Sequence, residues 1–259
     1  MGRSRIRLAA ALAAAVLALA GCGGSGDSGR GSGAASPGGI KVFAAASLTA
    51  AFTELGQDFT AANSTRVTFN FAGSQALATQ IRQAAPADVF ASADLANMDK
   101  VKDLVGTPRN FASNLLQIVV EKGNPKGVTG LGDLASSDLK VVLAAEEVPA
   151  GKYAKQVLDQ AGVTVRPVSQ EDNVKAVVTK VSLGEADAGI VYVTDVTAGG
   201  DRVEGVDIPE DQNVTATYPI ATVEASRNAA GAQAFVDLVL SAEGRRVLRQ
   251  HGFMPPPTT

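Results

Sequence analysis

The chain has 259 residues, of which 46% are hydrophobic and 19% charged, and its formal net charge at pH 7 is -3. This composition is typical of a folded globular protein with one or two domains and a sizeable core. An aromatic content of 5% and the lack of tryptophan argue against a large aromatic surface for binding sugars. The lack of a dense lysine and arginine cluster argues against a nucleic-acid partner. The single cysteine, Cys22, and the single histidine, His251, cannot form an internal disulfide or a histidine–cysteine zinc site.

The N-terminus has the pattern of an export signal. Arg3, Arg5 and Arg7 precede an apolar run of 13 residues, from 8 to 20. That run is too short for a membrane-spanning helix, which needs ~20 residues, and suits a signal-peptide core. It ends in Leu-Ala-Gly-Cys22, which resembles the bacterial lipobox. We predict a signal peptide over 1–21 and lipidation of Cys22, which would anchor the exported chain to the outer face of the cytoplasmic membrane.

Residues 22–39 are rich in glycine and serine and predict a flexible tether. Beyond it, apolar or alternating runs predict strands at 40–44, 66–71, 88–91, 115–120, 139–144, 188–193 and 218–223. Helical spacing predicts helices after Ser47 and Ser74 and at 95–105, 153–161, 174–183, 232–240 and 243–250. The alternation predicts an α/β fold, with mostly parallel sheets covered by helices on both faces.

Four short turns separate a predicted strand from a predicted helix, at 43–48, 71–74, 148–151 and 171–174. Ligands of α/β sheets lie beyond the carboxyl ends of strands. The first N–H groups of a helix have no acceptor inside it, and helix N-termini attract anions. Ser47 and Ser74 are either ordinary N-caps or hydroxyl donors to a ligand. Small residues in these turns leave room for a close approach to the backbone: Ala45, Ala46, Gly73, Ala150 and Gly151.

Four motifs in order resemble the periplasmic molybdate-binding proteins of ABC transporters. They are VFAAASL at 42–48, PADVFASAD at 86–94, VPAGKYA at 148–154 and GEADAGIVY at 184–192. Gly252-Phe253 near the end is also typical of that family. The resemblance covers nearly all of the chain after the tether. One departure lies in the second turn, where some relatives have a run of serines and Gly73 can offer only an amide.

The resemblance implies a two-lobed type II periplasmic binding protein fold, with two crossover strands near 115–120 and 218–223 as the hinge. Lobe 1 would comprise 40–120 plus 214–259, and lobe 2 would comprise 121–213. The anion would lie between the lobes. It would be held by the hydroxyls of Ser47 and Ser74, the amides of Ala150 and Val174, and the phenol of Tyr192, which is otherwise a core tyrosine.

The function implied is capture of molybdate or tungstate and delivery to the permease and ATPase of an ABC importer. The protein would be a monomer without catalysis or cofactor, and would hold the metal as an oxyanion with no direct metal ligands. A site of neutral donors favours ions that carry no proton, such as molybdate, tungstate or sulfate, because monohydrogen phosphate needs an acceptor for its O–H. Four carboxylates lie near the turns: Asp88, Asp94, Glu171 and Asp172. If one of them entered the pocket, it would supply the acceptor that a protonated ligand such as phosphate needs. We interpret Asp94 and Asp172 as helix caps or lobe contacts.

Three alternatives remain open. The same fold could bind sulfate, phosphate or a ferric complex, although a ferric site usually needs several tyrosines and only Tyr192 is expected in the cleft, not Tyr153 or Tyr218. An exported serine hydrolase would need His251 as its base, and the chain has no Gly-x-Ser-x-Gly elbow. A cell-surface interaction module with a vestigial cleft is the third.

Overall fold

The computed structural model of the protein describes residues 38–257. The predicted signal peptide, Cys22 and the predicted tether up to residue 37 lie outside this range. Within residues 38–257, no helix has the length and apolar character needed to cross a membrane.

The described chain forms one connected sheet in the order β2-β1-β3-β9-β4-β7-β5-β6, with β8 paired to β4. Lobe 1 contains β2, β1, β3, β9 and the first part of β4. Lobe 2 contains the second part of β4 and β5 to β8. The strands are β1 (Ile40–Ala45), β2 (Val67–Ala72), β3 (Val89–Ala91), β4 (Arg109–Glu121), β5 (Val141–Ala144), β6 (Ser169–Glu171), β7 (Ala188–Tyr192), β8 (Val203–Asp207) and β9 (Thr215–Thr222).

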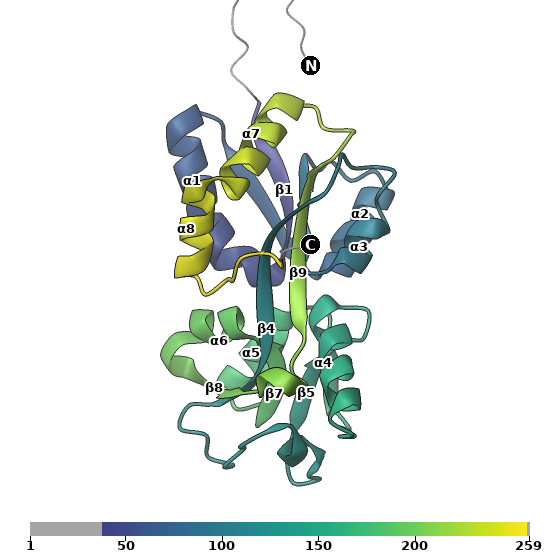
Figure 1. The fold of residues 1–259 in the computed structure, drawn as a ribbon, viewed down its shortest axis with the longest axis vertical. Helices are drawn as coiled ribbons and strands as arrows, with labels where there is room; N and C mark the ends of the chain where they lie inside the picture. Colours follow the sequence, from purple (N-terminus) through teal and green to yellow (C-terminus); the bar gives the residue numbers. More distant parts are fainter. Residues whose placement is uncertain (1–37, 258–259) are drawn as a thin grey trace, which may run out of the picture. The chain divides into compact units, whose positions relative to one another are not determined.

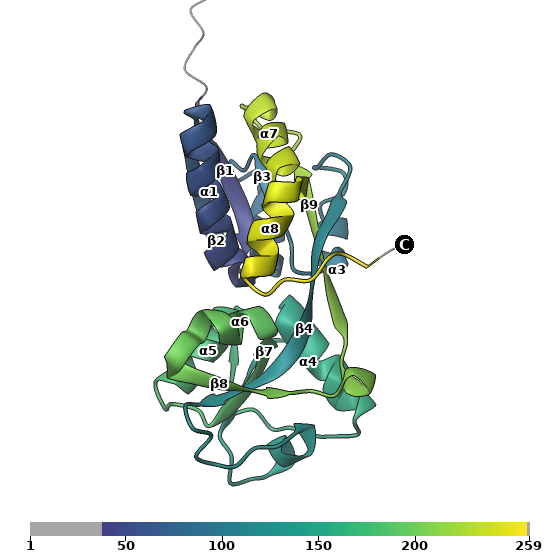
Figure 2. The ribbon, with the colours of Figure 1, turned by 60° about the vertical axis from the view of Figure 1, so that its left-hand side comes forward.

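Strand β4 joins the two lobes. Its first part, residues 109–115, pairs with β9 in lobe 1, and its second part, residues 116–121, pairs with β7 and β8 in lobe 2. Figures 1 and 2 show β4 and β9 side by side between the two groups of helices. The α/β two-lobed fold is thus confirmed. The predicted lobe boundaries stay a prediction, because β4 belongs to both lobes.

The sheet is mixed, which corrects the expectation of mostly parallel sheets. Strands β2, β1 and β3 run parallel in lobe 1, and β6, β5 and β7 run parallel in lobe 2. The pairings of β9 with β3 and β4, and of β4 with β7 and β8, are antiparallel. Strands β4 and β9, which connect the lobes, run in opposite directions. Strand β4 leads the chain from lobe 1 into lobe 2, and β9 leads it back.

Helices cover both faces of the lobe 1 sheet. In Figure 2, α1, α7 and α8 lie together on one face, and α2 and α3 lie on the other side of β1 in Figure 1. Phe43 of β1 packs in the smaller apolar cluster below α2 and α3, while its neighbours Val42 and Ala44 belong to the main core. This is the period-two alternation of a strand buried on both faces.

The helices, in chain order, are η1 (Ala46–Leu48), α1 (Thr49–Asn63), α2 (Ser74–Arg82), α3 (Leu95–Asp99), η2 (Leu131–Ala135), α4 (Pro149–Gln160), α5 (Val174–Ser182), α6 (Val193–Gly199), η3 (Gly200–Arg202), η4 (Glu210–Gln212), α7 (Ala229–Leu240) and α8 (Ala242–Gln250). Here η marks a 3-10 helix. Helix α4 begins four residues before its predicted start, with Pro149 in its first turn, where the missing N–H costs nothing. Helix α3 ends at Asp99, well short of the predicted 105.

Candidate functional site

The structure brings all five predicted ligand residues to one small cavity between the lobes. Each is at most 9% exposed. The cavity is lined by Ala45, Ala46, Ser47, Ala72, Gly73, Ser74, Ala93, Val148, Pro149, Ala150, Val174 and Tyr192.

The lining residues follow the carboxyl ends of parallel strands in both lobes. In lobe 1, Ser47 lies in η1 directly after β1, and Ser74 begins α2 after β2. In lobe 2, Ala150 lies in the first turn of α4 after β5, Val174 begins α5 after β6, and Tyr192 ends β7. Parallel neighbours place these strand ends at one edge of the sheet within each lobe, and the two edges face each other across the cavity.

Three of the helix starts at the cavity have no side-chain cap: those of η1, α2 and α4. At α5, Asn173 caps the amide of Ala176, two residues beyond Val174. Ordinary capping therefore does not explain the two serines, since Ser47 lies inside η1 and Gly73, not Ser74, is the cap residue of α2. First-turn amides, including those of Ala150 and Val174, have no acceptor within their helices and supply donors with partial positive charge.

The two serine hydroxyls are held in place by hydrogen bonds. One is to Tyr218, which does not line the cavity, and the other is to Ala93, which does. Ser47 Oγ lies 3.0 Å from Tyr218 Oη, in a hydrogen bond that either group can donate. Ser74 Oγ accepts a hydrogen bond from the Ala93 amide at 3.0 Å. A hydroxyl that accepts one bond keeps its own proton for another. Ser74 is therefore positioned to donate to a ligand oxygen.

Tyr192 carries a buried hydroxyl at the wall of the cavity. Its Oη has no hydrogen-bond partner within residues 38–257, although the side chain is only 1% exposed. Burial, reinforced by the neighbouring Tyr218 hydroxyl, raises the pKa of Tyr192 well above its usual value, so the phenol stays protonated. A buried donor without an acceptor is costly and rare in native structures. A ligand oxygen in the cavity would satisfy it.

No charged side chain is among the residues that line the cavity. Asp94 is both a cap and a lobe contact, because it accepts from the Asn97 amide and pairs with Lys152 of α4. Asp172 is a lobe contact only, since its carbonyl accepts from the Gln75 side chain. The other two carboxylates bond elsewhere: Asp88 to the Lys41 amide and Ser226, and Glu171 to Ser169 and Lys180.

Within residues 38–257 no group of three or more His, Cys, Asp or Glu side chains could hold a metal ion. The only histidine, His251, bonds Glu54 through Nε2 at 2.8 Å. It lines a second, larger cavity of ≈ 310 Å³, together with Lys175 and Arg202, that shares Ala46 and Ser47 with the small one. The larger cavity is also lined by Asp195, so both basic and acidic side chains border the site.

The small cavity has a volume of ≈ 10 Å³. That is about the space that a single water needs. An ion with four oxygens is larger, and the lining residues are buried. An ion therefore enters or leaves only when the lobes move apart, as binding proteins with a hinge do.

The two glycines of the turns serve packing, and only one lines the cavity. Gly151 does not line it; a Cβ there would lie 2.0 Å from the carbonyl oxygen of Ala145, which corrects its interpretation as room for a ligand. Gly73 lines it and is also close to the opposite lobe, since a Cβ would lie 2.5 Å from the Asp172 carbonyl oxygen.

We expect Gly73→Ala to weaken ligand binding about tenfold with little change in the fold of either lobe. The added methyl group meets the side chain of Gln75, which can move, and the Asp172 carbonyl of lobe 2, which cannot without a shift of that lobe. Titration calorimetry would measure the loss of ligand affinity, and the melting temperature of the unliganded protein would report any loss of stability. Wild-type affinity of this variant would contradict the prediction, because it would show that lobe 2 can shift away from the added methyl group without a loss of binding free energy.

Three residues next to the site were missed in the sequence. Tyr218 orients Ser47, the Ala93 amide orients Ser74, and Asp195 accepts from the Tyr192 amide at 3.2 Å in the first turn of α6. No pattern predicted α6 itself. Burial raises the pKa of Asp195 from 3.8 to about 7, against the lowering effect of that hydrogen bond and of Lys175.

This pKa gives a pH dependence. The folded chain holds a proton on Asp195 that the unfolded chain loses near pH 4, so the free energy of unfolding falls as pH rises from about 4 to 7. The loss attributable to this residue is at most about 4 kcal/mol. We expect Asp195→Asn, which keeps an acceptor for the Tyr192 amide, to flatten that slope in urea titrations from pH 4 to 8. An unchanged slope would contradict the assignment.

Comparisons with known proteins show the family and the fold of the chain. A family profile described as bacterial extracellular solute-binding protein matches residues 40–254. The molybdate-binding protein ModA of Mycobacterium tuberculosis is 45% identical over 234 residues, covering 86% of this chain and 90% of the relative. ModA of Escherichia coli is 33% identical, covering 85% and 90%. The structure of the Azotobacter vinelandii periplasmic molybdate-binding protein superposes with a TM-score of 0.74 at 19% identity, covering 84% and 100%.

Proposed function

Because this chain belongs to the bacterial extracellular solute-binding protein family, we propose that it captures molybdate or tungstate between its lobes and delivers the ion to an ABC importer. The observation that carries the proposal is the buried hydroxyl of Tyr192, which has no partner in the described part of the chain, beside the positioned hydroxyls of Ser47 and Ser74. With the first-turn amides of Ala150 and Val174, these groups form a donor set for an oxyanion. The protein binds and releases its ligand without catalysis, and the metal is held through its oxygens.

Donors without carboxylates favour an ion that carries no proton. Every oxygen of such an ion can accept a hydrogen bond from a neutral group, which offsets the cost of removing the dianion from water. Monohydrogen phosphate would leave its O–H facing donors only, and that mismatch costs affinity. Sulfate satisfies the donors equally well. Discrimination between sulfate and the larger molybdate and tungstate ions therefore depends on the size of the cavity when the lobes are closed.

A thermal-shift panel with molybdate, tungstate, sulfate, phosphate and chloride tests the proposal. A ligand at 100 times its dissociation constant stabilises a protein by ~2.7 kcal/mol, which raises the melting temperature by a few degrees. We expect that shift with molybdate and tungstate alone. A shift with sulfate or phosphate instead would change the ligand and keep the mode of binding. No shift with any of the ions would overturn the proposal.

We also propose that the chain acts on the outer face of the cytoplasmic membrane, anchored through Cys22. An anchored binding protein keeps its cargo near the permease and ATPase that it serves. Fractionation of cells that express the chain or its Cys22→Ser variant tests this. The wild type should sediment with membranes and carry a metabolically incorporated fatty-acid label, and the variant should do neither. A soluble, unlabelled wild type would refute the anchor without affecting the ligand.

A further inference from the structure

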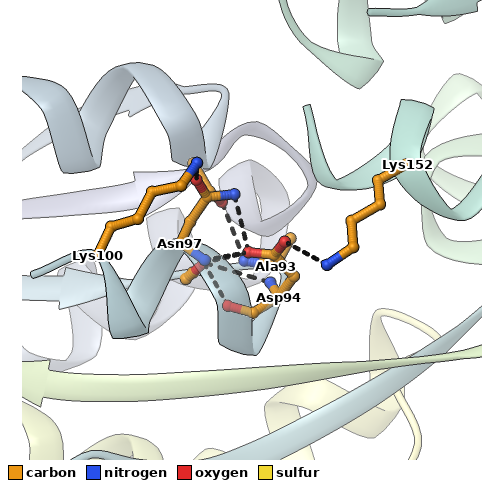
Figure 3. Close-up of polar contacts among 7 residues, drawn as sticks. Ala93, Asp94, Asn97, Lys100 and Lys152 are labelled. Carbon is orange, nitrogen blue, oxygen red and sulfur yellow. Dashed lines mark hydrogen bonds and ion pairs between the residues drawn. The ribbon is translucent and has the colours of Figure 1, made fainter. Parts of the chain in front are cut away.

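One ion pair joins the lobes next to the oxyanion site. Lys152 Nζ of α4, in lobe 2, lies 3.8 Å from Asp94 Oδ2, at the start of α3 in lobe 1. The Lys152 side chain is 50% exposed and that of Asp94 only 2%. Figure 3 shows Lys152 reaching from its helix toward the Asp94 carboxylate. Lys152 follows Ala150, a proposed ligand residue, by two positions in the same helical turn.

The other oxygen of Asp94 is engaged within lobe 1. Asp94 Oδ1 accepts from both the amide and the side-chain Nδ2 of Asn97, each at 2.9 Å, and so caps α3. Lys100 in turn donates to Asn97 Oδ1 at 2.9 Å. The two oxygens of one buried carboxylate thus have separate tasks: Oδ1 holds lobe 1 together, and Oδ2 faces lobe 2.

The loop that carries Asp94 also holds a ligand residue in place. Ser92 Oγ donates to the Asp94 carbonyl at 2.8 Å and accepts from the Asp94 amide at 3.2 Å, which makes the loop rigid. Between these two residues, the Ala93 amide donates to Ser74 Oγ. A displacement of Asp94 would therefore move the group that orients the Ser74 hydroxyl.

We propose that Asp94 is a positioning residue that couples the two halves of the oxyanion site. Through the Ala93 amide it orients Ser74 in lobe 1, and through Lys152 it holds the first turn of α4, with Ala150, against lobe 1. The pair forms only when the lobes lie together, so it slows release of the ligand. The inference rests on the proposed function for its binding readout, and it adds a residue that touches no ligand.

The test uses Asp94→Asn and Lys152→Gln in the full chain, with molybdate as the probe. Asparagine keeps the cap on α3, because it accepts hydrogen bonds at N-cap positions as well as aspartate does. We expect both variants to release molybdate about three- to tenfold faster, with little change in the association rate. Lys152→Gln should have the larger effect, since it leaves a buried carboxylate without its partner. The double variant should release molybdate no faster than Lys152→Gln.

Lys155→Gln is the matched control. Lys155 lies in the same helix and pairs with Asp159 of that helix, so its loss removes a lysine but no contact between lobes. We expect wild-type release from this variant. Release rates that match the wild type in both Asp94→Asn and Lys152→Gln, or effects that multiply in the double variant, would overturn the coupling.

A second measurement separates this inference from the proposed function. Small-angle scattering without any ligand should show a larger radius of gyration in Asp94→Asn and Lys152→Gln, and no change in Lys155→Gln. If the wild type binds no oxyanion, the proposed function fails, and the scattering still decides whether the pair holds the lobes together. Identical scattering from all four proteins would overturn the coupling by itself.

Discussion

Tyr192→Phe is expected to weaken molybdate binding by about 10- to 100-fold while leaving the unliganded protein at least as stable as the wild type. The lost interaction is a hydrogen bond to a charged ligand in a buried site, worth about 1.5–3 kcal/mol. In the unliganded protein the substitution removes a buried hydroxyl that has no partner within residues 38–257. The free energy of unfolding should therefore stay constant or rise, by up to about 1 kcal/mol.

Tyr218→Phe provides the comparison for this result. Tyr218 is equally buried and its ring centroid lies 5.9 Å from that of Tyr192, but its hydroxyl bonds Ser47. Its removal should lower the free energy of unfolding by about 1 kcal/mol and affect binding only through Ser47. Calorimetric titration and urea unfolding of both variants give the four values needed. Wild-type affinity of Tyr192→Phe would show that the phenol is a core group and would remove the main support for the oxyanion site.

Gly151→Ala is expected to cost about 3 kcal/mol or more in the free energy of unfolding and to abolish measurable binding. A Cβ at this position would lie 2.0 Å from the Ala145 carbonyl oxygen and 2.4 Å from that of Ala144. Both atoms are backbone, at the end of β5 and just beyond it, and cannot rotate away as a side chain would. Relief requires α4 to move off the strand, which exceeds the ordinary cost of overpacking and displaces the Ala150 amide.

Gly132→Ala is the control for a general effect of removing a glycine. Gly132 lies in η2 of the same lobe, and a Cβ there has no heavy atom within 4 Å. Its substitution should leave stability and binding unchanged or raise stability by a few tenths of a kcal/mol, through a less flexible unfolded chain. Urea unfolding compares the two variants directly. Equal stabilities would show that α4 is free to shift on β5.

The candidate site was predictable from the sequence because its parts are local. Ser47, Ser74, Ala150 and Val174 sit in turns where a strand gives way to a helix, and the change of period predicts those turns. The assignment of these four residues and Tyr192 to a ligand comes from the resemblance to the molybdate-binding proteins. Parallel strands bring such turns to one edge without further information. The resemblance in four motifs then connected Ser47 with Tyr192, which lie 145 positions apart, in a way that periodicity could not.

Long-range contacts could not be predicted, because they leave no local pattern. Residues 109–114 are mostly polar and do not indicate a strand, yet they begin β4 because β9 supplies backbone partners. Strand β8 likewise forms by pairing with β4. The sequence indicates Gly151 as space for a ligand, whereas in the structure the Ala145 carbonyl oxygen lies in that space.

What the sequence by itself determined is therefore the order of most strands and helices, the donor-rich turns between them and the family to which the fold belongs. Only the tertiary structure decided which partners those turns meet: Tyr218 for Ser47, Ala93 for Ser74 and Lys152 for Asp94. The physical reason is that periodicity records which face of an element is buried, whereas a hydrogen bond or ion pair depends on atoms brought within about 4 Å by the packing of distant segments.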